Sequence, residues 1–425
     1  MTAIAYRPKS GFARLIRFAE RAVAGRAGHI AATWYRQGTG VVPSHVVRML
    51  NHLSPFVARR SVGAVLAFML VAGCATTPAM PPPAPALTRD VVSTPASTWW
   101  RANGERTQTA ACRAATDALQ ETLRHSPTTT LMAVHGRDVL FSYGPTDRPS
   151  RIASARKSLL AMLYGKPVEQ GAIRLDDTLA DIGIDDIGGL LPIERQARIR
   201  DLLAARSGVY HLAANGGDDS AAAPPRGSQQ PGSYFLYNNW DFNAAGDIYE
   251  QLTGRNIYQA FAEDIATPLG LEDFHLERQH RSGDATRSQH LAYPFTLSTR
   301  DMARIGELML AHGAWDGKQL VSADWTRTIT TPVTRAADMH PARAARHRID
   351  YGYLWWIPEE PADSPLAGSY LAWGYFGQFI LVVPKRDMVI VHKYDTHAAI
   401  GDPIPRLDAR AFLVLARRLV DAPCT

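Results

Sequence analysis

A serine and a lysine stand three residues apart where an apolar segment begins, in "RIASARKSLLAMLYGKP", residues 151–167. Residues with this spacing are one helical turn apart, so we expect Ser154 and Lys157 to project from the same face of one helix. A serine hydroxyl is a poor nucleophile until a base takes its proton, and a lysine removed from water has a lowered pKa that suits it to that task. The tetrapeptide alone fits equally well a serine that caps a helix.

A second candidate pair is Tyr237 and Asn239, in "YFLYNNWDFNAAGD", which begins 80 residues after Ser154. A tyrosine beside an ammonium group favours partial ionisation, and it can then carry a proton between a serine and a leaving group. Asn239 offers a donor and an acceptor, which suits it to hold Lys157 and a substrate carbonyl. Taken singly, Tyr237 fits a half-buried aromatic residue and Asn239 fits a turn or cap residue.

A third candidate element is "AWGYFGQFILVVP", residues 372–384, where two glycines precede a strand pattern. Gly374 in such a place would let a substrate approach the backbone closely. The backbone N–H of Tyr375, together with that of Ser154, could form the two donors of an oxyanion hole. The alternative is a strand-entry turn in which glycine serves only to bend the chain.

The order of the expected elements predicts an α+β fold: an antiparallel sheet flanked by helices, with a mostly helical subdomain inserted at about 160–330. A helix is expected at 111–126 and a hairpin at 129–144, where two apolar runs flank "HGRD". Late segments rich in aromatic and β-branched residues are typical of strands, and a final helical pattern follows. We expect strands at 351–358, 377–384 and 387–395, and a helix at 406–421.

The first 98 residues are expected to lie outside the folded domain. "SVGAVLAFMLVAGC", residues 61–74, has the length and flanking arginines of a secretory signal, and its end resembles a bacterial lipoprotein lipobox with Cys74 as the lipidated residue. We therefore expect an upstream extension at 1–48, a signal peptide at 49–74, a Pro-rich tether at 75–98 and a hydrolase domain at 99–425. The protein would be exported to the periplasm and tethered to a membrane.

Charge and cysteine content support this division. Residues 1–74 hold ten of the 46 Lys and Arg but only one of the 40 Asp and Glu, so the remainder has a net charge of −3. Such a chain lacks the basic footprint of a nucleic-acid binder. With Cys74 as the anchor, Cys112 and Cys424 remain in an oxidising compartment, where we expect a disulfide between the first and last helices. Two separate buried thiols are the alternative.

Taken in order, Ser-x-x-Lys, Tyr-x-Asn and a late Gly-containing strand resemble the serine β-lactamase/penicillin-binding-protein superfamily. The class C branch is most similar, with its 6-aminohexanoate-dimer hydrolases and family VIII esterases, and the likeness runs from about residue 105 to 420. The resemblance implies a nucleophile at Ser154, its base at Lys157, a proton shuttle at Tyr237, a positioning role for Asn239 and an oxyanion hole from the N–H groups of Ser154 and Tyr375. It implies no metal and no organic cofactor.

Two neighbouring arginines are not part of that pattern. Arg156 has no role in the resemblance and should point away from Ser154 on the helix. The family usually carries Lys-Thr-Gly or His-Thr-Gly in its third motif, whose cation holds a substrate carboxylate, whereas this chain has Ala372-Trp373-Gly374. Arg206 is a candidate substitute for that cation, and a solvated arginine is the alternative.

The sequence thus favours a serine hydrolase that cleaves a small-molecule ester or linear amide through an acyl-enzyme. A penicillin-interacting D-Ala peptidase that acts on peptides, or a weak β-lactamase, is the alternative within the same chemistry. A non-catalytic binding protein on the same fold is the alternative from another class. Neither the physiological substrate nor the oligomeric state follows from the sequence.

Overall fold

The computed structural model describes residues 109–217, 219–395 and 407–424. All of them belong to one compact unit, which spans Val92–Thr425. The predicted signal peptide, the lipidation site at Cys74 and the Pro-rich tether lie outside the described residues, so the structure does not test them.

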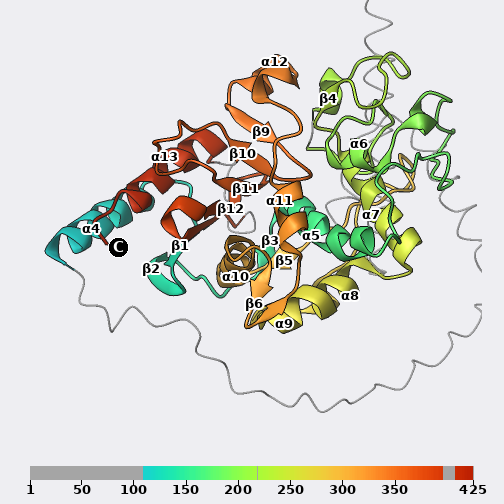
Figure 1. Ribbon diagram of the computed structural model, residues 1–425. Helices are drawn as coiled ribbons and strands as arrows, with labels where there is room; N and C mark the ends of the chain where they lie inside the picture. Colours follow the sequence, from blue (N-terminus) through green and yellow to red (C-terminus); the bar gives the residue numbers. More distant parts are fainter. Residues whose placement is uncertain (1–108, 218, 396–406, 425) are drawn as a thin grey trace, which may run out of the picture. The chain divides into compact units, whose positions relative to one another are not determined.

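A seven-stranded antiparallel sheet forms the centre of this unit, in the order β2-β1-β13-β12-β11-β10-β9 (Figure 1). Its strands are β1 (Thr130–His135), β2 (Asp138–Tyr143), β9 (Ile349–Tyr351), β10 (Trp356–Pro358), β11 (Tyr370–Gly374), β12 (Gln378–Val383) and β13 (Met388–Lys393). The early hairpin β1–β2 joins the late strands through β1 and β13, whose register pairs Thr130 with Lys393. The predicted antiparallel sheet, and with it the α+β class, is confirmed.

The expectation of one strand over 351–358 is wrong. The segment turns between β9 and β10, where Gly352 N–H donates to the Trp355 carbonyl and Leu354 has a φ of 61°. A Cβ at position 352 would overlap the carbonyl oxygen of Ile329, so only glycine fits this turn. The aromatic and β-branched composition therefore marks two short strands of a hairpin, and their connection is set by contacts with a distant segment.

Both faces of the sheet are buried, with the period of two that strands impose. In β12, Phe379, Leu381 and Val383 face a core cluster with the helices α4 (Ala110–Arg124) and α13 (Ala409–Val420). Ile380 and Val382 face the opposite cluster, which includes α5 (Arg156–Glu169) and α10 (Thr299–Leu310). The sheet thus lies between two layers of helices.

The helices α4 and α13 lie side by side on the same face of the sheet (Figure 1). A disulfide joins Cys112 in α4 to Cys424, just after α13, across a sequence separation of 312 residues. The two ends of the described chain are therefore covalently linked, as the sequence suggested for an oxidising compartment.

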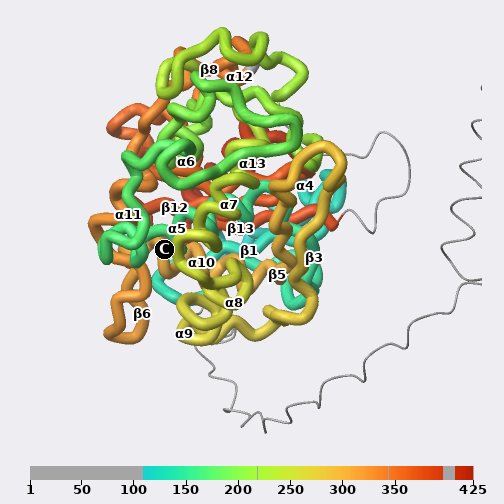
Figure 2. Tube along the Cα trace, turned by 90° about the vertical axis from the view of Figure 1, so that its right-hand side faces the viewer, coloured from blue at the N-terminus to red at the C-terminus, as the bar shows by residue number. Residues whose placement is uncertain are grey.

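Between β2 and β9 the longer regular elements are helices, joined by long loops and short strands, and they gather around α5, as the tube in Figure 2 shows. Its further helices are α6 (Ile199–Leu203), α7 (Asn239–Thr253), α8 (Ile257–Phe261), α9 (Thr267–Leu269), α11 (Ala323–Ile329) and α12 (Ala342–Ala345). Its short strands are β3 (Ser150–Arg151), β4 (Phe235–Leu236), β5 (Thr296–Leu297), β6 (Ala314–Trp315), β7 (Lys318–Gln319) and β8 (Met339–His340). In α5 all residues from Arg156 to Gly165 are buried, which is typical of a helix surrounded by protein on all sides. Among the described residues, no helix has the length and apolar character needed to span a membrane.

Candidate active site

The turn that carries Ser154 connects β3 to α5. Ala153–Ala155 form a 3₁₀ turn, and Ala153 has a φ of 48°, an unfavourable backbone conformation for a residue other than glycine. Such strain concentrates at functional sites, where surrounding contacts hold it in place. Ser154 does not cap α5, because the residue that precedes this helix is Ala155 and it makes no side-chain cap. The alternative of a capping serine is therefore wrong.

Lys157 lies one turn further on and is almost completely buried, with 1% of its surface exposed. Its Nζ atom donates to Ser154 Oγ at 2.7 Å, to Tyr237 Oη at 2.7 Å and to Asn239 Oδ1 at 2.9 Å. It also lies 4.4 Å from the ring centroids of Tyr237 and Phe242. The four side chains that the sequence singled out in two separate motifs therefore meet at one nitrogen atom.

Tyr237 and Asn239 reach this nitrogen because a strand ends and a helix begins beside α5. Tyr237 follows β4, and Asn238, not Asn239, caps α7 by accepting from the N–H of Trp240. The Asn239 side chain therefore connects Lys157 to Gly216. Its Oδ1 accepts from Lys157, and its Nδ2 donates to the Gly216 carbonyl at 2.9 Å. The alternative of a capping role for Asn239 is wrong.

The end of β11 lies directly against the Ser154 turn. A Cβ at position 374 would overlap the carbonyl oxygen of Ile152 and would stand 3.1 Å from the backbone nitrogen of Ala155. Gly374 is therefore needed so that the strand can approach the turn, a reason that the sequence did not reveal. Tyr375 follows β11 immediately, with 46% of its surface exposed.

Arg206 is partly exposed, and its guanidinium is bound by three neutral oxygen atoms. Its guanidinium donates to the carbonyl oxygens of Gly232 and Ser233 and to Thr334 Oγ1, at 2.8, 3.0 and 3.0 Å. These contacts fasten the segment before β4 to the segment before β8. The sequence did not foresee these three acceptors, because they lie 26, 27 and 128 residues away along the chain.

Aromatic side chains that the sequence did not single out continue from Tyr237 towards the sheet. The Trp356 ring lies 5.4 Å from the Tyr237 ring and 5.0 Å from the Trp373 ring, measured between centroids. His347 contacts Trp373 in turn, at 5.4 Å. The "LWWIP" segment gave a composition signal for a strand, but its contact with Tyr237 arises only when β10 pairs with β11.

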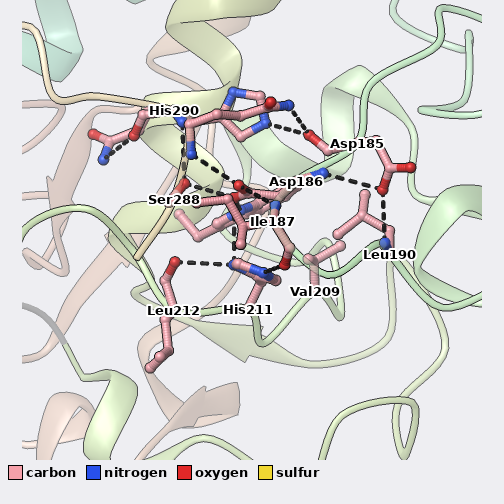
Figure 3. Close-up of polar contacts among 12 residues, drawn as sticks. Asp185, Asp186, Ile187, Leu190, Val209, His211, Leu212, Ser288 and His290 are labelled. Atoms are coloured by element: carbon pink, nitrogen blue, oxygen red, sulfur yellow. Dashed lines mark hydrogen bonds and ion pairs between the residues drawn. The ribbon is translucent and has the colours of Figure 1, made fainter. Parts of the chain in front are cut away.

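A buried polar cluster behind the site, which we call the Asp186 cluster, joins Asp186, His211, Ser288 and His290 (Figure 3). The Asp186 carboxylate accepts from Ser288 Oγ at 2.5 Å and from Trp240 Nε1 at 2.7 Å, and it lies 3.3 Å from His211 Nδ1. Ser288 Oγ in turn accepts from the His290 backbone N–H at 3.1 Å. These contacts join the segments that carry Asp186, His211 and Ser288 to Trp240 of α7.

Burial alone raises the pKa of the Asp186 carboxyl, but the bonds from Ser288, Gln289, Trp240 and Ile187 together outweigh burial and hold the pKa below its usual value. The cluster thereby anchors His211, which leads into the segment that carries Gly216. Since the Gly216 carbonyl holds Asn239, the cluster supports the geometry at Lys157 from behind.

Residues that could hold a metal ion are not grouped in this structure: the described part of the chain contains no set of three or more His, Cys, Asp and Glu side chains with suitable placement.

Comparison with known proteins places this geometry in a family. The sequence profile of the family described as "Beta-lactamase" matches residues 115–393. The chain is 31% identical over 166 residues to monacolin J acid methylbutanoyltransferase of Aspergillus terreus, a match that covers 32% of this chain and only 40% of that protein.

Solved structures show the same fold. A Bacillus anthracis protein assigned as a 6-aminohexanoate-dimer hydrolase superposes with a TM-score of 0.54 and 21% identity, over 71% of this chain and 80% of that one. Simvastatin synthase (LovD) from Aspergillus terreus superposes with a TM-score of 0.53 and 18% identity, over 74% of this chain and 98% of that one. The resemblance found in the three motifs is thus confirmed at the level of family and fold.

The Asp186→Asn variant is expected to lose about 2–4 kcal/mol of unfolding free energy at pH 7, because an amide cannot accept all the bonds that the carboxylate accepts. The folded carboxyl has a lowered pKa, so its stabilisation is complete above the ordinary Asp pKa and is lost as the pH falls through the folded value. Urea unfolding from pH 7 to pH 3 should therefore show the difference between wild type and variant shrinking below about pH 4. Asp324→Asn, at a side chain 87% exposed, is the control, and an equally unstable control would contradict this account.

Proposed function

This chain belongs to the beta-lactamase family, and we propose that it is a serine enzyme that cleaves carboxylic esters or linear amides through an acyl-Ser154 intermediate. The observation that carries the proposal is the position of Lys157 Nζ, which lies 2.7 Å from both Ser154 Oγ and Tyr237 Oη. A nucleophile and its base within hydrogen-bond reach, with the base held by a third group, are what acyl transfer requires.

The reaction would proceed in two steps. Ser154 Oγ attacks the substrate carbonyl carbon while its proton passes to Lys157 and Tyr237, and the N–H groups of Ser154 and Tyr375 stabilise the negative oxygen. The bond to the leaving alcohol or amine breaks, and the same proton passes to that leaving group. A water molecule then attacks the acyl carbon, and its proton passes through Tyr237 and Lys157 to Ser154 Oγ. The ester bond breaks, which releases the carboxylic acid and restores Ser154.

We propose that the acyl part of the substrate carries no carboxylate close to the carbonyl that Ser154 attacks. At the third motif Ala372 is fully buried and Trp373 packs between Trp356 and His347, so neither supplies the cation that would attract a carboxylate. Arg206 is bound to carbonyl oxygens elsewhere. This supports esters and linear amides over β-lactams and D-Ala peptides, whose carboxylate would be left unpaired.

A second candidate function differs only in the molecule that accepts the acyl group from Ser154. The curated relative at 31% identity is named as a methylbutanoyltransferase, a name that describes transfer of an acyl group to another molecule. The same acyl-Ser154 would then react with an alcohol in place of water. The third candidate, a binding protein without catalysis, is the least supported, because Lys157, Tyr237 and Asn239 all converge on the nucleophile.

A fluorophosphonate probe should label Ser154, and Ser154→Ala should abolish labelling. Lys157→Met and Tyr237→Phe should each slow labelling by about 10²–10⁴, since each removes a proton-transfer group. Lys385→Met and Tyr143→Phe are matched controls outside the site, and their rates should equal that of wild type within about threefold. Intact-mass spectrometry over time gives the rates, and undiminished labelling of Ser154→Ala would refute the nucleophile.

Substrate class can be measured with short-chain nitrophenyl esters, the matching anilides, nitrocefin and a D-Ala-D-Ala peptide. We expect kcat/KM for the best ester to exceed that for nitrocefin by at least about 10³, because the lactam carboxylate finds no cation. A methanol titration that diverts product to the methyl ester would favour the transferase. Efficient nitrocefin turnover would contradict the neutral acyl site.

We also propose that the protein is exported and held to a membrane by a lipid on Cys74. The support is the signal-like segment 61–74 and its lipobox-like end. Cys74→Ser should move the protein from the membrane to the soluble fraction, and unchanged fractionation would contradict lipid anchoring.

A further inference from the structure

Two adjacent cations on α5 are held by two asparagines on α7. Lys157 Nζ donates to Asn239 Oδ1 at 2.9 Å, and one Arg156 nitrogen donates to Asn243 Oδ1 at 2.9 Å. Asn239 and Asn243 are four residues apart, so they lie on the same face of α7, about 6 Å apart along its axis. The guanidinium thus lies in the layer next to the amine that we propose as the base.

Arg156 is an unusual buried charge. Only 4% of its surface is exposed, and its guanidinium carbon lies 4.0 Å from the centroid of the Tyr293 ring. Its second terminal nitrogen has no hydrogen-bond partner, and Arg156 forms no ion pair with a carboxylate of the described residues. A buried cation is unfavourable unless a carboxylate balances it, and this one contacts an amide oxygen and the Tyr293 side chain instead.

The other ionisable groups near these two cations are either tyrosines or side chains that are bound to a partner. Around Arg156 they are Tyr293, Tyr258 on α8, and Arg281, which is bound to Asp247 and Glu250. Tyr237 contacts Lys157 directly, and Asp241, further along α7, accepts from Ser207 Oγ at 2.6 Å. The carboxylates of this group, Asp247 and Glu250, are thus bound to Arg281, and neither forms an ion pair with Arg156.

Arg156 is also connected to the site through hydrogen bonds. Asn243 Nδ2 donates to Asn215 Oδ1 at 2.9 Å, and Asn215 Nδ2 donates to the Gly216 carbonyl at 3.1 Å. That carbonyl accepts from Asn239 Nδ2 at 2.9 Å. A continuous chain of side-chain and backbone bonds thus runs from Arg156 to the asparagine that holds Lys157.

We propose that Arg156 is a positioning residue for this site: its uncompensated buried charge disfavours the ammonium form of Lys157, and its bond to Asn243 fixes the segment that orients Asn239. The inference rests on the proposed function, since it assigns how the base becomes ready to accept the Ser154 proton. It also explains why asparagine, and not aspartate, stands at position 243. A carboxylate there would pair with Arg156 and cancel its effect on Lys157.

The test is the pH dependence of Ser154 labelling by a fluorophosphonate probe, which needs no knowledge of the substrate. In Arg156→Met the acid limb of the rate profile should move to higher pH by about one unit, because Lys157 then keeps its proton longer. The isosteric Asn243→Asp should move it in the same direction while Arg156 stays in place. Arg156→Lys should preserve the wild-type midpoint.

Arg327→Met, at a side chain 71% exposed, is the matched control for loss of a positive charge. Thermal unfolding of each variant identifies loss of fold, and Asn243→Asp keeps the test valid if Arg156→Met does not fold. A uniform loss of rate with an unchanged midpoint in both variants would overturn the inference and leave the proposed function intact. No labelling of the wild type at any pH would overturn the proposed function and the inference together.

Discussion

The site depends on one buried nitrogen atom. Lys157 Nζ is removed from water and bonded to three oxygen atoms, from Ser154, Tyr237 and Asn239, which come from α5 and from the junction of β4 and α7. The three donated bonds are those of an ammonium group, and to act as the proposed base Lys157 must lose one proton, after which its lone pair can accept from Ser154 Oγ; removal from water favours that loss. Every element described around the site either positions this atom or keeps water away from it.

The surroundings of α5 serve that requirement in two ways. On the sheet side, Gly374 lets β11 approach the Ser154 turn, and the strained Ala153 is held between that strand and the helix. On the helical side, the Asp186 cluster and the asparagines of α7 fix segments that have little regular structure of their own. Most polar groups of the Asp186 cluster and of these asparagines have a partner, whereas one terminal nitrogen of the buried Arg156 has none, and from that cation we infer a role.

Family membership and site geometry support different parts of the proposed function. The family gives the fold and the general class of acyl chemistry, whereas one fold supports many substrates. The features that bear on substrate belong to this chain: Ala372 and Trp373 in the third motif, the aromatic contacts from Tyr237 to Trp356, and an Arg206 that is bound elsewhere. These features support our proposal of an uncharged acyl group more strongly than family membership alone does.

The sequence by itself determined what depends on local geometry. Helical spacing placed Ser154 and Lys157 on one face, strand composition indicated an antiparallel sheet, and the order of three motifs indicated the family. Tertiary structure alone decided why Gly374 is glycine, where residues 351–358 turn, what Arg206 binds, and that Arg156 is buried against Asn243. Spacing along a helix is fixed by backbone dihedrals, whereas these contacts join residues up to about 220 positions apart, and their partners are set by how loops and layers pack.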